Sequence, residues 1–262
     1  MSSYDAPMGA ATFHPDTVLA ALRNVECRVA FLQPCRRPQD ARGGQNPDRL
    51  HKFHQYQVII MPPPADIQKL VIHSLYECGV DPGKHSIDFV ENNWQSPSMG
   101  AGGKGYEVLC NGTEVLQFTY FQQLAGKELD LVPIEIAYGV ERLCMVNQSK
   151  DHVYDLIWDV VSGKEILYGE VHATFETEIS KAAYPAESLK LLFNAYENIC
   201  LELSKSDEVI PAYEAFINLS HIFNLIECNG TVGVNERVTL LGRTRKCANS
   251  CLAKFVGGNL VN

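Results

Sequence analysis

Arginine side chains are concentrated in one short polar stretch of the sequence, residues 36–57. It holds four arginines, Arg36, Arg37, Arg42 and Arg49, together with two glycines and two prolines. A guanidinium group presents a planar fork of donors that can bind a phosphate group through two parallel hydrogen bonds. The stretch is therefore typical of a loop that holds a polyanion, although its composition alone would also fit a charged, solvated loop.

An aromatic ring and two amides follow the last of these arginines at regular spacing. Phe53 comes four residues after Arg49, and Gln55 and Gln57 continue at every second position. Because alternate residues of a strand share one face, these side chains would point the same way. A ring, a guanidinium group and amides on one face can stack a base and hydrogen-bond to its edge. We therefore expect a nucleotide site here.

Two apolar runs enclose the arginine-rich stretch and indicate the strands that carry it. Residues 29–32 precede the stretch and residues 58–61 follow it. β-forming runs on either side of a polar segment that is broken by Gly and Pro are typical of antiparallel strands joined by a long loop. We expect this arrangement for residues 29–61.

A second strand pair is predicted around Asn111-Gly112, because this dipeptide is the strongest short signal for a β-hairpin. Its second arm carries Gln117 and Thr119 on one face, and buried polar groups need partners, which either the protein or a ligand supplies. The glycine-rich residues 96–105 before the hairpin are expected to form a flexible loop that could close over a ligand.

A strand over residues 133–137 is predicted to lead directly into a helix that begins with Gly139-Val-Glu-Arg142. The start of a helix exposes backbone N–H groups, and Arg142 lies close enough to this junction to reach a bound anion. A simple pair between Arg142 and Glu141 or another neighbour is at least as common.

From residue 151 onward the sequence predicts helices. Three apolar stripes at helical spacing indicate a small bundle: Leu189, Leu192, Phe193, Tyr196, Ile199, Cys200 and Leu203; Ala212, Phe216, Leu219, Phe223 and Ile226; and Val238, Leu241, Ala248, Leu252 and Phe255. We place a boundary near residues 158–180. The expected fold class is α+β, an antiparallel sheet flanked by helices and followed by a helical bundle.

Composition narrows the possible function classes. The chain has 262 residues, with 22 Lys+Arg against 31 Asp+Glu and a net charge of −9, so we expect a partner to carry the basic surface if nucleic acid is bound. The nine cysteines include no Cys-x-x-Cys pair, and we find no convincing metal cluster. A P-loop is absent, and we find neither a signal peptide nor a stretch that is long and apolar enough to span a membrane.

Longer runs of the sequence resemble the α subunit of the bacterial two-subunit glycyl-tRNA synthetase, a class II aminoacyl-tRNA synthetase. The runs are Gln33-Pro-Cys-Arg-Arg-Pro-Gln-Asp-Ala-Arg, Gln45-Asn-Pro-Asp-Arg-Leu, Gln117-Phe-Thr-Tyr-Phe-Gln-Gln, Tyr138-Gly-Val-Glu-Arg-Leu and Val153-Tyr-Asp-Leu-Ile-Trp. The first two and the fourth correspond to motifs 2 and 3 of class II enzymes. The resemblance covers nearly the whole chain.

This resemblance implies a class II synthetase core in residues 1–160 and a helical C-terminal domain in residues 161–262. It also implies a cytoplasmic glycine-tRNA ligase that uses ATP and Mg²⁺ to form glycyl-adenylate. The glycyl group would then pass to tRNA(Gly) with the help of a β subunit. Two alternatives are a synthetase-like paralogue that binds a nucleotide or an amino acid without catalysis, and a purely structural subunit.

The resemblance assigns a role in ATP binding to each of several residues. Arg36, with Arg37 as the alternate, would hold the α-phosphate and the attacking carboxylate. Arg49 would hold the γ-phosphate. Phe53 and Arg142 would cover the two faces of adenine, with Gln55 beside them. Glu107 or Glu114 would bind the magnesium ion that bridges the phosphates, unless these are exposed hairpin carboxylates.

Glycine would bind next to the phosphates. Glu135 is expected to pair with its ammonium group, because a buried cation needs a carboxylate. Gln117 and Thr119 would line the pocket, and Trp94 would form a wall that excludes larger amino acids by steric clash. The family tends to carry tryptophan where residues 96–105 have glycines, so we expect a looser glycine pocket.

One departure concerns assembly. The family normally has a further helix and strand, the motif 1 region, before a segment that resembles residues 8–15, and the present sequence largely lacks that region. Motif 1 builds the dimer interface of class II enzymes. This departure therefore concerns the expected assembly, which is an α–α dimer within a tetramer of two α and two β subunits.

Overall fold

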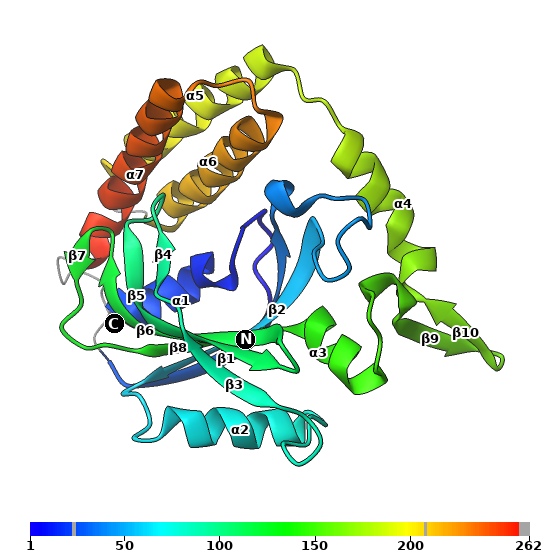
Figure 1. The fold of residues 1–262 in the computed structure, drawn as a ribbon. Coiled ribbons are helices and arrows are strands. Elements are labelled where there is room, and N and C mark those ends of the chain that lie inside the picture. The colour runs from blue at the N-terminus through cyan, green and yellow to red at the C-terminus, as the bar shows by residue number, and fades with distance from the viewer. Residues whose placement is uncertain (23–24, 207–208, 257–262) are drawn as a thin grey trace.

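The structure, a computed structural model, describes residues 1–22, 25–206 and 209–256. An antiparallel sheet lies at its centre, with helices on both faces (Figure 1). The strands are β1 Cys27–Arg36, β2 Lys52–Met61, β3 Ile87–Glu91, β4 Trp94–Ser96, β5 Ala101–Cys110, β6 Thr113–Leu124, β7 Lys127–Glu128 and β8 Ile134–Gly139. Their order is β1-β2-β8-β6-β5-β3, with β4 beside β5 and β7 beside β6. The predicted fold class is confirmed.

The arginine-rich stretch connects two strands of this sheet. β1 and β2 pair antiparallel, with Cys27 opposite Met61 at one end and Arg36 opposite Lys52 at the other. Residues 37–51 form the loop between them. Near the middle of this loop Gly43 and Gly44 adopt φ angles of 55° and 81°, a left-handed conformation that glycine tolerates without strain. The predicted strand–loop–strand arrangement is therefore present.

The predicted hairpin at Asn111-Gly112 joins β5 and β6. Both residues have positive φ angles, 51° and 85°, as a two-residue hairpin turn of this type requires. The prediction of a flexible loop over residues 96–105 was wrong, because residues 101–105 belong to β5. At Gly103 an added Cβ would meet the backbone O of Tyr120 at 1.8 Å, so glycine allows the neighbouring strand to approach closely.

One face of the sheet packs on helix α2 Ile67–Glu77, whose N-cap Asp66 accepts a hydrogen bond from the Lys69 N–H. α2 presents Ile67, Val71 and Leu75 to this face, and alternate residues of β6 and β8, which include Phe118 and Ile136, complete the cluster. Helix α3 Val140–Gln148 starts directly after β8 and contributes Leu143. This strand-to-helix junction confirms the element predicted at Gly139.

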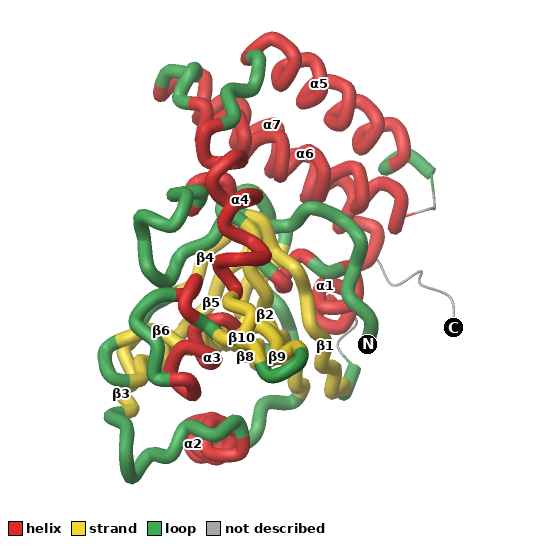
Figure 2. The backbone as a smooth tube through the Cα atoms, turned by 90° about the vertical axis from the view of Figure 1, so that its right-hand side faces the viewer, coloured by secondary structure: helices red, strands yellow, loops and turns green. Residues whose placement is uncertain are grey.

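Four helices lie on the opposite side of the sheet: α1 Pro15–Leu22, α5 Ala186–Leu203, α6 Val209–Asn229 and α7 Val234–Val256. Figure 2 shows α5, α6 and α7 side by side at one end of the molecule. The bundle shares one hydrophobic cluster with Phe13 of the N-terminal segment and with Phe121 and Leu124 of β6. The rings of Phe13 and Phe216 stack at 6.1 Å. The Phe255 side chain, predicted on the third stripe, and residues 257–262 lie outside the described part.

In the part of the chain that the structure describes, one helix is long and apolar enough to cross a membrane by length and composition alone. The expectation that no stretch of the sequence would pass this test was wrong. Helix α6 meets this test over Val209–Asn229, and 67% of its apolar window is buried inside the structure. Its Ala212, Phe216 and Leu219 side chains are fully enclosed. Its packing is that of the central helix of a bundle.

The prediction that the chain is helical from residue 151 onward was also wrong. A short hairpin, β9 Ile157–Val161 and β10 Lys164–Leu167, projects from the molecule ahead of helix α4 Tyr168–Lys181 (Figure 1). Its turn, Ser162-Gly163, has φ angles of 52° and 78°. The β-branched residues that surround this turn favour strands, and this local signal outweighs the helical pattern farther along.

Candidate active site

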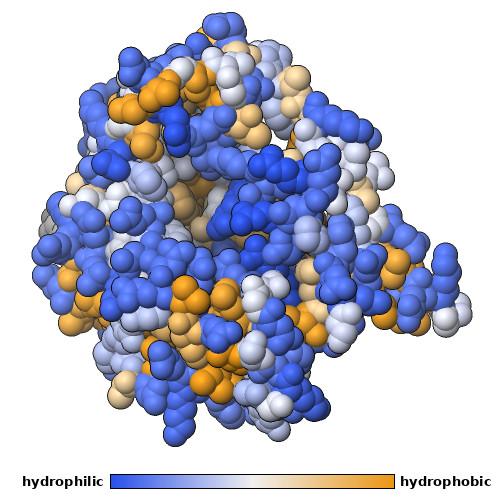
Figure 3. All heavy atoms as spheres, viewed as in Figure 1, coloured by the Kyte–Doolittle hydropathy of each residue, from blue (hydrophilic) through white to orange (hydrophobic). Residues whose placement is uncertain are grey.

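A cavity of about 310 Å³ opens on the sheet face that is turned away from α2. The surface is hollowed on this side, and hydrophilic side chains line the hollow (Figure 3). Strands β2, β6 and β8 form its floor, and the loop 37–51, the β3–β4 segment and the start of α3 form its walls. Alternate residues of these strands, such as Gln55, Thr119 and Glu135, face the cavity, because their neighbours face α2.

Eleven of the twelve residues predicted for the site line this cavity. They are Arg37, Arg49, Phe53, Gln55, Trp94, Glu107, Glu114, Gln117, Thr119, Glu135 and Arg142. Arg36, the first choice for the α-phosphate, is not among the described lining residues. Burial lowers the pKa values of His51 and His221 to about 4, and the charge of Arg36, which lies near both rings, lowers them further. The geometry therefore favours the alternate, Arg37.

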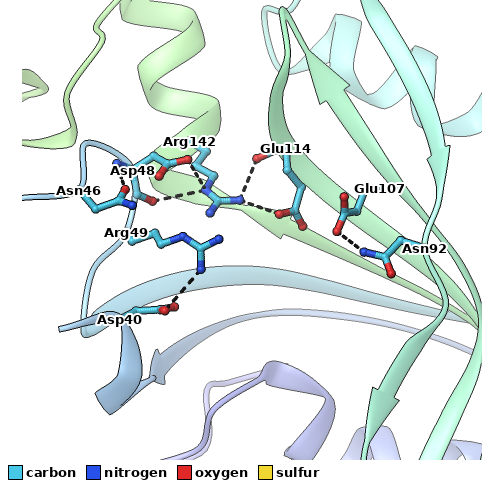
Figure 4. A network of polar contacts seen from close by, with 8 residues as sticks. All are labelled: Asp40, Asn46, Asp48, Arg49, Asn92, Glu107, Glu114 and Arg142. Atoms are coloured by element: carbon cyan, nitrogen blue, oxygen red, sulfur yellow. Dashed lines mark hydrogen bonds and ion pairs between the residues drawn. The ribbon is translucent and has the colours of Figure 1, made fainter. Parts of the chain in front are cut away.

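Arg142 is held in the cavity wall by two carboxylates from distant segments (Figure 4). Its Nη1 donates to Glu114 Oε2 at 2.8 Å and to the Glu114 backbone O at 3.1 Å. Its Nε lies 3.6 Å from Asp48 Oδ2, on the loop after β1. Contacts from both sides of the guanidinium group fix its orientation, which a stacking role would need. The alternative of an ordinary pair between Arg142 and Glu141 or another neighbour holds in part, because Glu141 bonds to His54 while Arg142 pairs with Glu114 and Asp48.

The two other arginines of the cavity come from the β1–β2 connection. Arg37 donates from Nε to the Gly9 backbone O at 2.8 Å, and its guanidinium carbon lies 4.9 Å from the centre of the Phe53 ring. Arg49 is exposed and lies 3.4 Å from Asp40 Oδ1, pointing towards the space beside Arg142 in Figure 4. An exposed pair of this kind contributes little stability, so Arg49 can exchange Asp40 for a ligand at small cost.

Glu135 is a buried carboxylate at the inner end of the cavity. Its Oε1 accepts hydrogen bonds from Thr12 Oγ1 and Gln57 Nε2, and its Oε2 has no partner among the described residues. Burial raises the pKa of Glu135 to about 7, although the two hydrogen bonds act in the opposite direction. An unpaired acceptor oxygen in an enclosed pocket is suited to a small cationic ligand.

Two further carboxylates fix the start of β2, and neither could be recognised from a local pattern in the sequence. Glu141 of α3 accepts from the backbone N of His54 at 3.0 Å and contacts its Nδ1 at 2.7 Å. Glu176 of α4 accepts from the backbone N of His51 at 2.7 Å and of Lys52 at 3.1 Å. Both pairings join segments far apart in the sequence, so they position the strand that carries Phe53 and Gln55.

The charges that line the cavity suit a metal–phosphate ligand better than a bare anion. The lining includes three arginines, Arg37, Arg49 and Arg142. It also includes six carboxylates, those of Asp40, Asp48, Glu107, Glu114, Glu135 and Glu141. In the described part of the chain no group of three or more His, Cys, Asp or Glu side chains could hold a metal alone. Mg²⁺ commonly binds through one or two carboxylates plus substrate phosphates, and Glu107 and Glu114 fit that donor set.

The glycines of residues 96–105 do not form the wall of this cavity. Trp94, just before those residues, lines the cavity together with Asn92, Asn93 and Gln95, and its ring lies 5.4 Å from that of Phe121. Gly100, Gly102 and Gly103 line a separate groove behind β4. None of residues 96–105 is among the described residues that line the cavity, so the expectation that their glycines loosen the glycine pocket stays a prediction without support from this geometry.

Comparison with known proteins places the chain in a family. Two solved structures of the pyrrolysyl-tRNA synthetase of Desulfitobacterium hafniense match 62% of this chain, with TM-scores of 0.40 and 0.37 and sequence identities of 14% and 15%. The match spans 57% of the length of each of those chains. A family model described as "Glycyl-tRNA synthetase alpha subunit" matches residues 1–259. This chain belongs to the glycyl-tRNA synthetase alpha subunit family.

Proposed function

We propose that the chain is the α subunit of a glycine-tRNA ligase, which activates glycine with ATP and, with a β subunit, transfers it to tRNA(Gly). The observation that carries the proposal is the shared cavity. It brings three arginines and Phe53 into one space with the buried, half-satisfied carboxylate of Glu135. A triphosphate needs the first set and an amino-acid ammonium group needs the second.

ATP is proposed to bind at the end that the β1–β2 connection forms. Phe53 would stack on one face of adenine and Arg142 on the other, with Gln55 beside the base. Arg37 would contact the α-phosphate, because its Nε contact with Gly9 leaves the rest of the fork for a ligand. Arg49, at the exposed rim, would hold the γ-phosphate.

Glycine is proposed to bind over β6 and β8. Glu135 would take up the ammonium group with the oxygen that lacks a partner, and Gln117 and Thr119 would line the remaining space. Trp94 would close the pocket. The smallest amino acid can be selected in this way, since any side chain would meet the wall.

The adenylation step needs no nucleophilic side chain. A glycine carboxylate oxygen forms a bond to the α-phosphorus of ATP, the bond from that phosphorus to the bridging oxygen breaks, and pyrophosphate leaves with the electron pair. No proton is transferred. The protein residues contribute alignment, and Arg37 contributes positive charge where the five-coordinate phosphorus becomes most negative.

Magnesium would be held by Glu107 or Glu114 together with phosphate oxygens. When bound, it would neutralise phosphate charge in a cavity that otherwise holds more carboxylates than arginines. Glu107 already accepts a hydrogen bond from Asn92, and Glu114 contacts Arg142. These contacts keep both carboxylates in place as donors.

The proposed partners follow from the family and the charge. A net charge of −9 makes this chain a weak binder of tRNA by itself, so a β subunit would supply most tRNA contacts. We propose the tetramer of two α and two β subunits and the cytoplasm as the working assembly and location. The division into a catalytic core, residues 1–160, and a helical part, residues 161–262, is likewise proposed.

The test is glycine-dependent exchange of pyrophosphate into ATP, with and without added β subunit. Arg142→Ala should abolish exchange and leave the circular dichroism spectrum unchanged. Arg28→Ala is the matched control, because Arg28 is exposed on β1 outside the cavity.

Each other outcome favours a specific alternative. Exchange that is retained in Arg142→Ala would contradict the role of Arg142. ATP or glycine binding without any exchange in the wild type would favour a binding paralogue. Neither binding nor exchange, even with the β subunit present, would favour a structural subunit.

A further inference from the structure

A short segment near the N-terminus, residues 8–13, runs between the cavity and the helical bundle, and we name it the N-terminal strap. All of its residues except Gly9 are buried. Its last three residues form η1 Ala11–Phe13, a single turn of 3-10 helix. The roles proposed above for adenylation include no residue of the strap, although Ala10 and Thr12 line the cavity.

The start of the strap is fixed to the end of β1. The Met8 backbone O accepts a hydrogen bond from the Arg36 N–H at 2.8 Å. The Gly9 backbone O accepts from Arg37 Nε, also at 2.8 Å. Both bonds come from the strand and loop that lead to the proposed ATP end of the cavity. This part of the strap is therefore held by the sheet.

The middle of the strap contacts two side chains of the cavity. The Ala11 N–H donates to Gln55 Oε1 at 2.9 Å. Thr12 Oγ1 donates to Glu135 Oε1, the oxygen that also accepts from Gln57 Nε2. Glu135 Oε2 has no partner among the described residues. Because both donors bind the same oxygen, they leave the other oxygen of the carboxylate for a ligand.

The end of the strap is held by the helical bundle. The Tyr213 hydroxyl of α6 donates to the Phe13 backbone O at 2.8 Å, across 200 positions of the sequence. Tyr213 is fully buried, and burial raises its pKa well above the usual value, so the hydroxyl keeps its proton in any neutral assay. A buried carbonyl oxygen needs a donor. Tyr213 therefore fixes the peptide that directly follows Thr12.

We propose that Tyr213 is a positioning residue for glycine binding, which acts through the strap and Thr12 on Glu135. The proposal rests on the proposed function. The Phe13 carbonyl and the Thr12 side chain belong to one 3-10 turn, so a change in the position of the first moves the second. The bundle would thus act on the amino-acid side of the cavity, although none of its described residues lines that cavity.

The groups around Glu135 make its ionisation a suitable measure of this effect. The strap and β2 present neutral donors, Thr12 and Gln57, and Thr119 of β6 lies opposite Glu135 in the sheet. Cys35 of β1 is neutral, because burial raises its pKa to about 12. Within the described chain no charged side chain hydrogen-bonds to Glu135. Loss of the Thr12 bond removes a donor to the ionised form and should raise the pKa of Glu135.

The test measures glycine-dependent ATP–pyrophosphate exchange in the complex of the α chain with its β subunit. Tyr213→Phe should raise the KM for glycine at least threefold, with the KM for ATP within twofold of wild type, because the start of the strap keeps its contacts with the sheet. The pH midpoint of kcat/KM for glycine should move upward. Tyr196→Phe is the matched control, since this half-buried tyrosine of α5 packs on the same cluster and its hydroxyl has no hydrogen-bond partner within the described residues.

A double variant distinguishes positioning from a general loss of stability. Thr12→Val keeps the shape of the side chain but loses the hydroxyl, and it should raise the KM for glycine at least fivefold. Thr12→Ser restores the hydroxyl and should recover most of the affinity. If Tyr213 acts through Thr12, adding Tyr213→Phe to Thr12→Val should change the KM for glycine by less than twofold.

Three outcomes would overturn the proposal: an unchanged KM for glycine in Tyr213→Phe, equal increases in the KM values for glycine and ATP, and increases that multiply in the double variant. Absence of exchange in the wild-type complex would instead remove the proposed function itself. That failure is distinguishable because it needs no variant.

Discussion

At the scale of single residues, the protonation of Glu135 should set how the enzyme depends on pH. Its pKa is raised to about 7 by burial, so the carboxyl group is mostly neutral at pH 6 and mostly ionised at pH 8. Only the ionised form pairs with an ammonium group. The kcat/KM for glycine in pyrophosphate exchange should therefore fall roughly tenfold from pH 8 to pH 6.

Glu135→Gln provides the control for this prediction. The amide keeps the size of the side chain and can still accept from Gln57, but it carries no charge at any pH. Its kcat/KM for glycine should be low and nearly constant between pH 6 and pH 8, while the KM for ATP stays close to wild type. A variant that keeps the wild-type pH profile would assign the titration to another group.

The residue types of the site could be predicted from the sequence, but the choice between neighbouring arginines could not. Spacing by two residues correctly placed Phe53 and Gln55 on one face, because strand geometry fixes that relation locally. Of the pair Arg36 and Arg37, Arg37 lines the cavity, and which of the two does so depends on β8 and β6, strands formed by residues far along the chain.

At the scale of secondary-structure elements, the glycines of β5 should be a structural requirement. In Gly103→Ala the added Cβ would overlap the Tyr120 backbone O, so β5 and β6 would have to separate. We expect a loss of at least about 2 kcal/mol in the free energy of unfolding, measured with urea. Gly242→Ala is the control.

Gly242 lies within helix α7, and an added Cβ there meets no atom within 4 Å. Alanine is also the better helix former, by roughly 0.5–1 kcal/mol. Gly242→Ala should therefore be slightly stabilising. If both glycine variants unfolded at the same urea concentration, close approach of the β5 and β6 backbones would not explain Gly103.

Helix α4 should act on the nucleotide end of the cavity through one buried carboxylate. Glu176→Ala leaves the His51 and Lys52 N–H groups without their acceptor, and each buried donor without a partner costs about 1–3 kcal/mol. We expect lower stability and a higher KM for ATP, because these two residues precede Phe53. Glu178→Ala, an exposed position of the same helix, should change neither value. If the two variants had the same stability and the same KM for ATP, α4 would have no role in positioning the start of β2.

The elements that were predicted incorrectly from the sequence have a physical explanation in each case. Glycine usually breaks strands, so residues 101–105 were expected in a loop, yet the close approach of β6 at Gly103 is possible only without a side chain there. In the hairpin of β9 and β10 the strands are short, and a periodic helix follows immediately. Hydrophobic periodicity in the sequence indicates the long helix but not the short strands that precede it.

At the scale of the whole molecule, the sheet and the helical bundle should unfold together. Cluster residues from the N-terminal segment, β6 and the bundle pack into one core, and the Tyr213 hydroxyl of α6 donates to the Phe13 backbone O at 2.8 Å. The proposed boundary after residue 160 would therefore separate two regions by their function, although both regions share one hydrophobic core. A shared core of this size favours a single cooperative transition.

Phe216→Ala tests this coupling. Phe216 is fully buried on α6 and stacks on Phe13, so its removal should cost about 3–5 kcal/mol. Because the core is shared, helical circular dichroism and the fluorescence of Trp94, which packs against the same cluster, should shift by the same urea concentration in a Trp158→Phe background. Leu191→Ala should shift neither signal appreciably, since Leu191 is 71% exposed on α5. A bundle signal that moves while the Trp94 signal stays at its wild-type midpoint would show that the two parts fold independently.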